Sequence, residues 1–413
     1  KRSEQAHGVA LVLFGALIPV GEGLAFGALT LLTLIVVGRW RELDKALFSR
    51  GIGAQVVRGL VVWFLAGVAA LWLGGEGWLK PTELGRWLPL VAVPVVGVSV
   101  ASLPVVWARR AALAFVGALV AASLFAVAQF ALDVRPGEML SRARADLPSQ
   151  GRLPSNPDRS VAGGFYYHRL KMAHVLLVGL APLVARQLFA TLTPRRRAVE
   201  LVLVALLGVT LALTFTRAAL LAGAAAAAAT TAFAPRRWRI AAGGLLVVAA
   251  VLLLSIAPVR ERLISSTDRD ASDTRAFIWS RAVQVMVDHP LGVGLGNYST
   301  VVERYYGGVD AGRAPRTYPH NIVLGAWAEA GPLGLAGFLW AYAAPLVACA
   351  AELRRRRAGV RQVAAASGLF ALVALGAVGL THDVLFHNAV ALAYASLLGL
   401  VVGCLDGEPC ASP

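Results

Sequence analysis

Long apolar stretches, separated by short clusters of arginine, constrain the fold of this chain more than any other feature. Charged residues make up only 15% of the chain and hydrophobic residues 58%, which excludes a soluble domain of this size. An α-helix needs about 20 apolar residues to cross the hydrocarbon core of a bilayer. We therefore expect an all-α integral membrane protein. By length and hydropathy we find about 12 spanning runs, near residues 8–20, 24–38, 55–73, 88–106, 111–132, 170–190, 198–214, 217–233, 240–257, 321–350, 363–381 and 386–404.

The arginine clusters indicate the orientation of these runs. Short loops rich in Lys and Arg stay on the cytoplasmic side of a membrane. Each cluster follows an even number of predicted crossings, so we expect both termini in the cytoplasm. The same clusters account for most of the net charge of +16, which therefore does not indicate nucleic-acid binding. The clusters are RWRELDKALFSR (39–50), WARR (107–110), PRRR (194–197), PRRWR (235–239) and ELRRRRAGVR (352–361).

Two predicted outer segments, 133–169 and 258–319, are longer than ordinary connections, and long connections commonly carry function. We divide the chain accordingly into three parts. Residues 1–257 hold the first nine spans, the segment 258–319 is a large and partly helical outer loop, and residues 320–413 hold the last three spans and a cytoplasmic tail.

Within the large outer loop, the stretch DTRAFIWSRAVQVMVDHP has apolar residues at helical spacing, and Pro290 stops the pattern. This predicts an amphipathic helix that lies on the outer surface of the membrane. The glycine-rich stretch LGVGLGNYST comes next. No predicted strand precedes it, so it does not indicate a nucleotide-binding fold.

Arg217 stands inside an apolar stretch, at the outer end of a predicted hairpin of two spans. An arginine that extends its charge to the membrane interface explains such a position. The alternative is an anion-binding residue in an outward-facing cavity. Arg275 and Arg281 lie on the predicted amphipathic helix, and Arg169 and Lys171 end the first outer segment. Because arginine binds phosphate with two parallel hydrogen bonds, these residues predict a phosphate or pyrophosphate site at the outer face.

His320 follows a proline at the start of the predicted tenth span. The positive end of a helix dipole favours neutral imidazole, which can accept a proton from a sugar hydroxyl. A structural capping histidine is the alternative. Glu329 lies within the same span, where a buried acid is more often functional. However, Gly331 and Pro332 follow it, so Glu329 could instead satisfy backbone groups freed by a break in the helix. No compact set of metal ligands is evident, and we expect neither metal nor cofactor.

Three motifs, in this order along the chain, resemble those of a known family: TFTRAALL, RAFIWSRAVQVMVDHPLGVGLGNY and HNIVLGAWAEAG. The set resembles the O-antigen ligase and polymerase superfamily. With a large loop between the ninth and tenth spans, the chain looks most like the O-antigen ligase branch. The specific part of the resemblance covers residues 214–334, and upstream of residue 165 it rests on topology alone. The resemblance implies a GT-C-like glycosyltransferase of the bacterial inner membrane.

The resemblance also implies an activity. Such an enzyme transfers a glycan from undecaprenyl pyrophosphate to a sugar hydroxyl of lipid A-core at the periplasmic face, with inversion and without a metal, and so completes lipopolysaccharide. It implies that Arg217 and Arg275 hold the pyrophosphate and that His320 acts at the acceptor, as a base or by positioning it. The other residues that we expect to bind substrate are Arg281, Arg169, Lys171, Asn321 and Glu329.

Other functions stay open at this point. An O-antigen polymerase or an O-linked oligosaccharyltransferase would use the same donor and differ only in its acceptor. A transporter for an anionic lipid belongs to a different class, and typically shows charges midway along its spans and inverted repeats. Here the charges gather at the outer face and no repeat is visible, so the sequence favours transfer over transport.

Overall fold

The computed structural model describes residues 2–43, 49–73, 85–133, 152–153, 156–166, 168–255, 260, 269–306, 318–356 and 359–407. Within these residues the structure is helical, with one short antiparallel pair of strands, β1 (Arg152–Leu153) and β2 (Asn156–Ser160). The first helices are α1 (Arg2–Leu17), α2 (Glu22–Gly38), α4 (Gly51–Leu73), η1 (Leu88–Val91), α6 (Ala92–Ser102) and α7 (Val105–Leu132). The middle of the chain forms α9 (Arg169–Phe189), α10 (Pro194–Leu213), α11 (Arg217–Thr231) and α12 (Arg236–Ser255). The rest are α14 (Arg269–Asp288), α15 (Tyr298–Val302), η5 (Glu303–Tyr305), α16 (Ile322–Arg354), α17 (Val360–Gly379), η6 (Val384–Phe386) and α18 (Asn388–Asp406).

The predicted all-helical membrane architecture is confirmed, and each predicted apolar run overlaps a helix. In the described part of the chain, six helices are long and apolar enough to cross a membrane, namely α4, α7, α9, α16, α17 and α18. Helix α2 and the pair η1–α6 are apolar but shorter. The count of twelve spans, the GT-C-like classification and the three-part division of the chain stay predictions. The hairpin of β1 and β2 was not predicted, because its polar residues have no alternating pattern.

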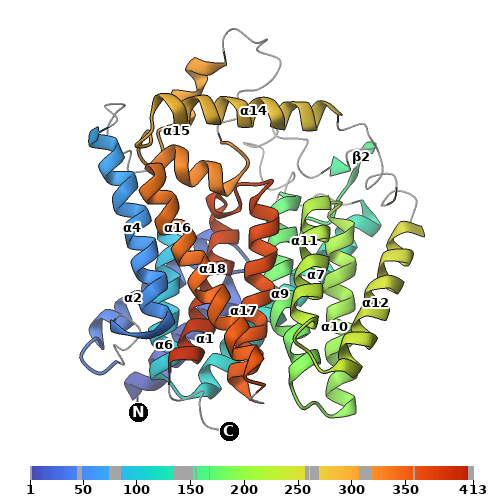
Figure 1. The fold of residues 1–413 in the computed structure, drawn as a ribbon. Coiled ribbons are helices and arrows are strands. Elements are labelled where there is room, and N and C mark those ends of the chain that lie inside the picture. The colour runs from blue at the N-terminus through green and yellow to red at the C-terminus, as the bar shows by residue number, and fades with distance from the viewer. Residues whose placement is uncertain are drawn as a thin grey trace.

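The helices stand side by side, and α14 lies across one end of the bundle (Figure 1). We call this the outer end, following the orientation predicted from the sequence. The start of α1 and the end of α18 both lie at the opposite, inner end (Figure 1). There the carboxylate of Asp406 accepts hydrogen bonds from the backbone N–H groups of Ile52 and Gly53, at 3.1 and 2.7 Å. The arrangement agrees with the expectation that both termini share one side.

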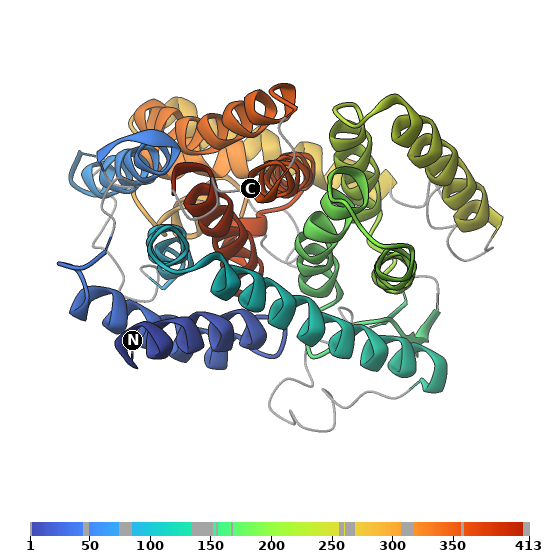
Figure 2. The same ribbon diagram turned by 90° about the horizontal axis from the view of Figure 1, so that it is seen from below.

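Close packing at the centre of the bundle depends on small residues. Helices α4 and α16 meet through Gly59 and Gly337: a Cβ on either would lie 2.5 Å from a backbone nitrogen of the other helix. Glycine at such a contact lets two membrane helices approach closely and gain dispersion energy along their length. Seen from below, α17 and α18 occupy the middle of the bundle (Figure 2). Their side chains are mostly buried, as are those of α9.

Helix α16 is broken near its outer end, where Gly331 has φ 64° and ψ −170°. Pro332 follows and has no backbone N–H, so the carbonyl of Ala328 loses its partner inside the helix. The short outer piece, residues 322–330, turns away from the long inner piece at this point (Figure 1). The break that the sequence indicated at Gly331 and Pro332 is confirmed.

Helix α14 is the amphipathic helix that the sequence predicted. Its buried residues Ile278, Ala282 and Val285 recur at helical spacing and face the bundle, where α14 packs against α16. Val283 and Val287 are exposed on another face. The helix ends at Asp288, two residues before the proline that was expected to stop it. This helix therefore holds its arginines at the outer end of the bundle.

Candidate functional site

The candidate site lies at the outer end, where the turn between α17 and α18 meets the start of α16. Asp383, in this turn, is 5% exposed, and its carboxylate faces the residues that open α16. Its Oδ2 accepts a hydrogen bond from the backbone N–H of His320 at 2.7 Å. Its Oδ1 accepts one from the backbone N–H of Asn321 at 3.1 Å. Asp383 thereby fixes the backbone at the start of α16.

His320 is held in an unusual conformation by these contacts. Its φ is 51°, in the left-handed region that a residue with a side chain rarely occupies. Its imidazole is 32% exposed, and Nδ1 lies 3.5 Å from Oδ2 of Asp383. This distance is slightly longer than a hydrogen bond, and such contacts often tighten when a substrate binds. The Nδ1 atom of His320 is thus directed at the carboxylate of Asp383.

Asn321 is the N-cap of α16. Its side-chain oxygen accepts hydrogen bonds from the backbone N–H groups of Val323 and Leu324, at 2.9 and 3.2 Å. Its side-chain nitrogen donates to the carbonyl of Leu380 at 3.2 Å. These bonds satisfy the first turn of the helix and attach it to the end of α17. The structure thus gives Asn321 a positioning role, and its predicted contact with substrate stays a prediction.

The electrostatics of the turn are set by burial. Burial raises the pKa of Asp383 to about 7, against the opposing effect of its two backbone hydrogen bonds and the charge of Arg86. Burial, followed by the charge of Arg275, lowers the pKa of the neighbouring His382 to about 3. The second effect shows that Arg275 of α14 acts electrostatically on this turn. Arg275 of α14 therefore lies near the turn that carries Asp383.

Arg217 is the first residue of α11 and lies at the outer end, as predicted. The N-cap residue, Thr216, makes no side-chain bond to the helix, since its hydroxyl bonds to the carbonyl of Thr214. Phe215 has φ 51° and is buried, which makes the turn before Arg217 tight. The outer segment covers this turn: Ala162 N–H donates to the carbonyl of Leu213 at 3.1 Å. An arginine at the positive end of a helix suits an anion.

Arg169 and Lys171 open α9, which packs against α11. Their helix is capped by His168, whose Nδ1 accepts a hydrogen bond from the N–H of Leu170 at 3.2 Å. Lys171 forms an ion pair with Glu22 at the start of α2. Arg169 and Arg217 thus lie at the outer ends of neighbouring helices. The ion pair gives Lys171 a role in joining α2 to α9, and its contact with substrate stays a prediction.

Arg281 is occupied within its own helix. Its guanidinium carbon lies 4.7 Å from the ring centroid of Phe277, and its NH1 donates to Oε1 of Gln284 at 2.7 Å. The other residue predicted to bind substrate from this part of the chain, Glu329, is 5% exposed. The predicted substrate contacts of Arg281 and Glu329 stay predictions.

The glycine-rich turn after α14 packs against the broken part of α16. The N–H groups of Val293 and Gly294 donate to the carbonyls of Ala328 and Glu329, both at 2.9 Å. The N–H of Gly296 donates to Oε1 of Glu329 at 3.2 Å. The turn thus satisfies the backbone groups that the break in α16 leaves open. Gly292, Gly294 and Gly296 all have positive φ, which explains the glycine at every second position.

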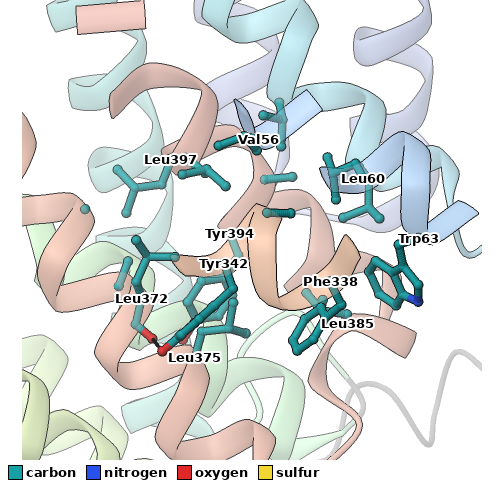
Figure 3. Close-up of a pocket in the computed structure, with 17 residues that line it drawn as sticks. Val56, Leu60, Trp63, Phe338, Tyr342, Leu372, Leu375, Leu385, Tyr394 and Leu397 are labelled. Carbon is teal, nitrogen blue, oxygen red and sulfur yellow. Dashed lines mark hydrogen bonds between the residues drawn. The ribbon is translucent and has the colours of Figure 1, made fainter. Parts of the chain in front are cut away.

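An apolar cavity of about 60 Å³ lies below the site, between α4, α16, α17 and α18 (Figure 3). Leu385, from the same turn as Asp383, lines it together with Trp63, Phe338, Tyr342 and Tyr394. An engineered cavity that binds benzene has about 150 Å³. The volume of this cavity is smaller than that of such a ligand-binding cavity.

Sequence reasoning missed two residues of the site. It assigned no site role to Asp383, whose link to His320 spans 63 residues. It did not consider Arg86, which precedes η1 and influences Asp383. A carboxylate next to a histidine in THDVLFHN was the available signal for Asp383. Within the described residues, no group of three or more His, Cys, Asp or Glu side chains is placed to hold a metal ion.

A family model described as O-antigen ligase matches residues 202–339. This segment of the chain is therefore similar to the O-antigen ligase family. The matched segment runs from α10 into α16, and it contains Arg217, Arg275 and His320. The resemblance drawn from the three sequence motifs is thereby confirmed. No curated protein matches the chain. Arg86 and Asp383 lie outside the matched segment, and their place in the candidate site rests on the geometry given above.

Proposed function

We propose that this protein is an O-antigen ligase that transfers a glycan from undecaprenyl pyrophosphate to a sugar hydroxyl of lipid A-core at the periplasmic face of the inner membrane. The observation that carries the proposal is His320, whose backbone N–H and imidazole both face the buried carboxylate of Asp383. The matched segment supports the reaction class, because it contains the histidine and both of the predicted catalytic arginines.

The arginines fit a pyrophosphate leaving group. Arg217 stands at the positive end of α11, and Arg275, on α14, acts by its charge on His382 in the turn that carries Asp383. Guanidinium groups bind phosphate oxygens with paired hydrogen bonds, and they stabilise the charge that develops as the glycosidic bond breaks. In other phosphate-transferring sites a metal ion provides this stabilisation. We propose that arginine replaces the metal here.

His320 fits a general base. In the proposed step, Nε2 takes the proton from the acceptor hydroxyl while the hydroxyl oxygen bonds to the anomeric carbon. The bond from that carbon to the pyrophosphate oxygen breaks, and undecaprenyl pyrophosphate leaves. Asp383 holds Nδ1–H and stabilises the imidazolium that forms, as a carboxylate does beside other catalytic histidines. A single direct displacement gives inversion at the anomeric carbon.

Reconstitution tests the proposal. Purified protein receives undecaprenyl-pyrophosphate glycan in metal-free buffer, with or without lipid A-core, and the products are separated on a gel. Glycan on lipid A-core, only when that acceptor is present, is the expected result. Longer lipid-linked glycan without acceptor would instead establish a polymerase. Transfer to a protein acceptor would establish an O-linked oligosaccharyltransferase, the other activity that uses the same donor.

A further inference from the structure

Two arginine clusters that are distant in the sequence meet at the inner end of the bundle. Helices α10, α11 and α12 stand together at one side of the bundle (Figure 1). Because α11 begins at the outer end with Arg217, both α10 and α12 begin at the inner end. The first cluster comprises Arg195, Arg196 and Arg197 of α10, and the second comprises Arg236, Arg237 and Arg239 of α12.

Trp238 joins the two clusters. The guanidinium carbon of Arg197 lies 4.3 Å from the ring centroid of Trp238, and that of Arg237 lies 5.8 Å from it. Both distances are within the range of cation–π attraction, about 6 Å. Arg197 also donates from NH1 to the carbonyl of Gln187, near the end of α9, at 3.5 Å. These contacts hold the start of α10 beside the start of α12.

Acidic residues of the same stretches do not balance the charge of the clusters. Residues 190–200 and 231–240 contain six arginines and one acidic residue, Glu200. The carboxylate of Glu200 accepts hydrogen bonds from Nε and NH2 of Arg186, at 3.0 and 2.7 Å. Glu200 is therefore paired with an arginine outside the clusters. Five of the six arginines are exposed: Arg195, Arg196, Arg236, Arg237 and Arg239.

Exposed apolar side chains begin just beyond the arginines along both helices. They are Val199 and Val202 of α10 and Ile240 of α12. On a helix in a membrane, such side chains face the lipid chains, whereas tryptophan is enriched at the boundary between membrane and water. The arginines, with Trp238 among them, therefore lie at the depth of the lipid headgroups.

We propose that the two clusters together bind the phosphate headgroup of an anionic membrane phospholipid. Guanidinium groups bind phosphate oxygens with paired hydrogen bonds. Basic sites between helices on the cytoplasmic side of a membrane suit anionic lipids, including those with two phosphates. The ammonium group of a zwitterionic lipid offsets this attraction. The inference does not rest on the proposed ligase function, because the clusters lie at the opposite end of the bundle from His320.

The bound lipid stabilises the part of the bundle that carries Arg217. Helices α10 and α12 precede and follow α11 in the chain, and Arg217 is the first residue of α11. A headgroup that contacts both clusters connects the two inner ends and opposes their separation. A ligand that binds only the folded state raises the melting temperature of a protein. We therefore expect the lipid to act on stability and not on the chemistry at the outer end.

Native mass spectrometry of the full chain in detergent measures the binding. The lipids are phosphatidylglycerol, cardiolipin with its two phosphates, and zwitterionic phosphatidylcholine. The variant Arg196→Gln/Arg237→Gln removes one charge from each cluster, and Arg195→Gln/Arg236→Gln is a second such pair. Arg196→Lys/Arg237→Lys keeps the charge. Thermal melting without added lipid shows whether each variant is folded.

The matched control is Arg109→Gln/Arg110→Gln. These two exposed arginines belong to another predicted cytoplasmic cluster, near the start of α7. Arg110 also lies over a tryptophan, with its guanidinium carbon 4.9 Å from the ring centroid of Trp107. The control therefore removes the same charge from a similar setting within a single stretch of the chain.

Both glutamine pairs from α10 and α12 are expected to bind the anionic lipids about tenfold more weakly than wild type, because each basic residue at a membrane surface adds to the attraction. Their binding of phosphatidylcholine should not change. The lysine pair should keep most of the affinity, and the control should bind as wild type. Cardiolipin should raise the melting temperature of wild type more than that of the glutamine pairs.

Three results would overturn the site. The first is a loss in Arg109→Gln/Arg110→Gln equal to that in the α10 and α12 pairs, which would show a general attraction to the charge of the inner face. The second is unchanged binding of anionic lipid by both of those pairs. The third is equal affinity of wild type for phosphatidylcholine and for the anionic lipids, and this comparison needs no variant.

Discussion

Asp383 connects the two parts of the chain that form the candidate site. It is buried, it binds two backbone N–H groups at the start of α16, and it lies 3.5 Å from the imidazole of His320. Neutralising it would leave those N–H groups with a weaker partner and the imidazolium without a counter-charge. We expect its effect on the transfer rate and its effect on the free energy of unfolding to depend on pH in opposite directions. The two roles can therefore be tested separately.

Transfer should fall as the pH is lowered through about 7, because the pKa of Asp383 is raised from 3.8 to about 7 and the reaction needs the carboxylate. The effect on stability has the opposite pH dependence. Because its pKa is raised, Asp383 binds a proton more tightly in the folded state than in the unfolded state. Its contribution to the free energy of unfolding is therefore lost as the pH rises from about 4 to 7. Asp383→Asn should remove this fall in rate at low pH and should slow transfer about 10²–10⁴-fold. An Asn variant with the wild-type rate and profile would contradict the role.

Glu329 offers a second test at this scale. Its carboxylate accepts from the N–H of Gly296, and an amide oxygen can do the same. Glu329→Gln should therefore keep the glycine-rich turn in place, with a melting temperature near that of wild type. Glu329→Ala should lose about 1–3 kcal/mol of stability, because a buried donor loses its partner. Loss of transfer in a stable Gln variant would show instead that the charge binds substrate.

At the scale of elements, hydropathy located the helices, because this signal is local in sequence. The orientation that the arginine clusters indicate stays a prediction. The amphipathic pattern of residues 276–286 likewise predicted α14, and Gly331 with Pro332 predicted the break in α16. Contacts between segments that are distant in the chain have no such local pattern in the sequence. The pairing of the glycine-rich turn with the broken helix, and of Asp383 with His320, appears only when the chain is folded.

The glycine-rich turn and the break in α16 should behave as one unit. Gly331 has φ 64°, and a Cβ there would lie 2.6 Å from the carbonyl oxygen of Leu291. Gly331→Ala should lower the melting temperature, with a cost of more than about 1 kcal/mol, and should reduce transfer by disturbing the start of α16. Gly117→Ala is the control, since an added Cβ on that residue of α7 meets nothing within 4 Å. Equal melting of the two variants would contradict this coupling.

At the scale of the whole molecule, the predicted orientation can be tested by labelling. Ser280 lies exposed on α14 at the outer end, and Arg195 lies exposed near the start of α10. In intact cells with a permeable outer membrane, Ser280→Cys should react with a membrane-impermeant maleimide. Arg195→Cys should react only after the inner membrane is opened. The native Cys349 and Cys404 are buried and should contribute little signal. The reverse labelling pattern would show that the predicted orientation is wrong and that the candidate site faces the cytoplasm.

The central claim is that His320 performs the transfer and that arginines bind the donor. The measurement that tests it most directly compares His320→Ala with Arg217→Ala and Arg275→Ala in the reconstituted reaction, with donor binding measured alongside transfer. We predict that His320→Ala abolishes transfer and retains donor binding, whereas the arginine variants lose both while still inserting into the membrane. Normal transfer by His320→Ala, or normal transfer by either arginine variant, would contradict the account.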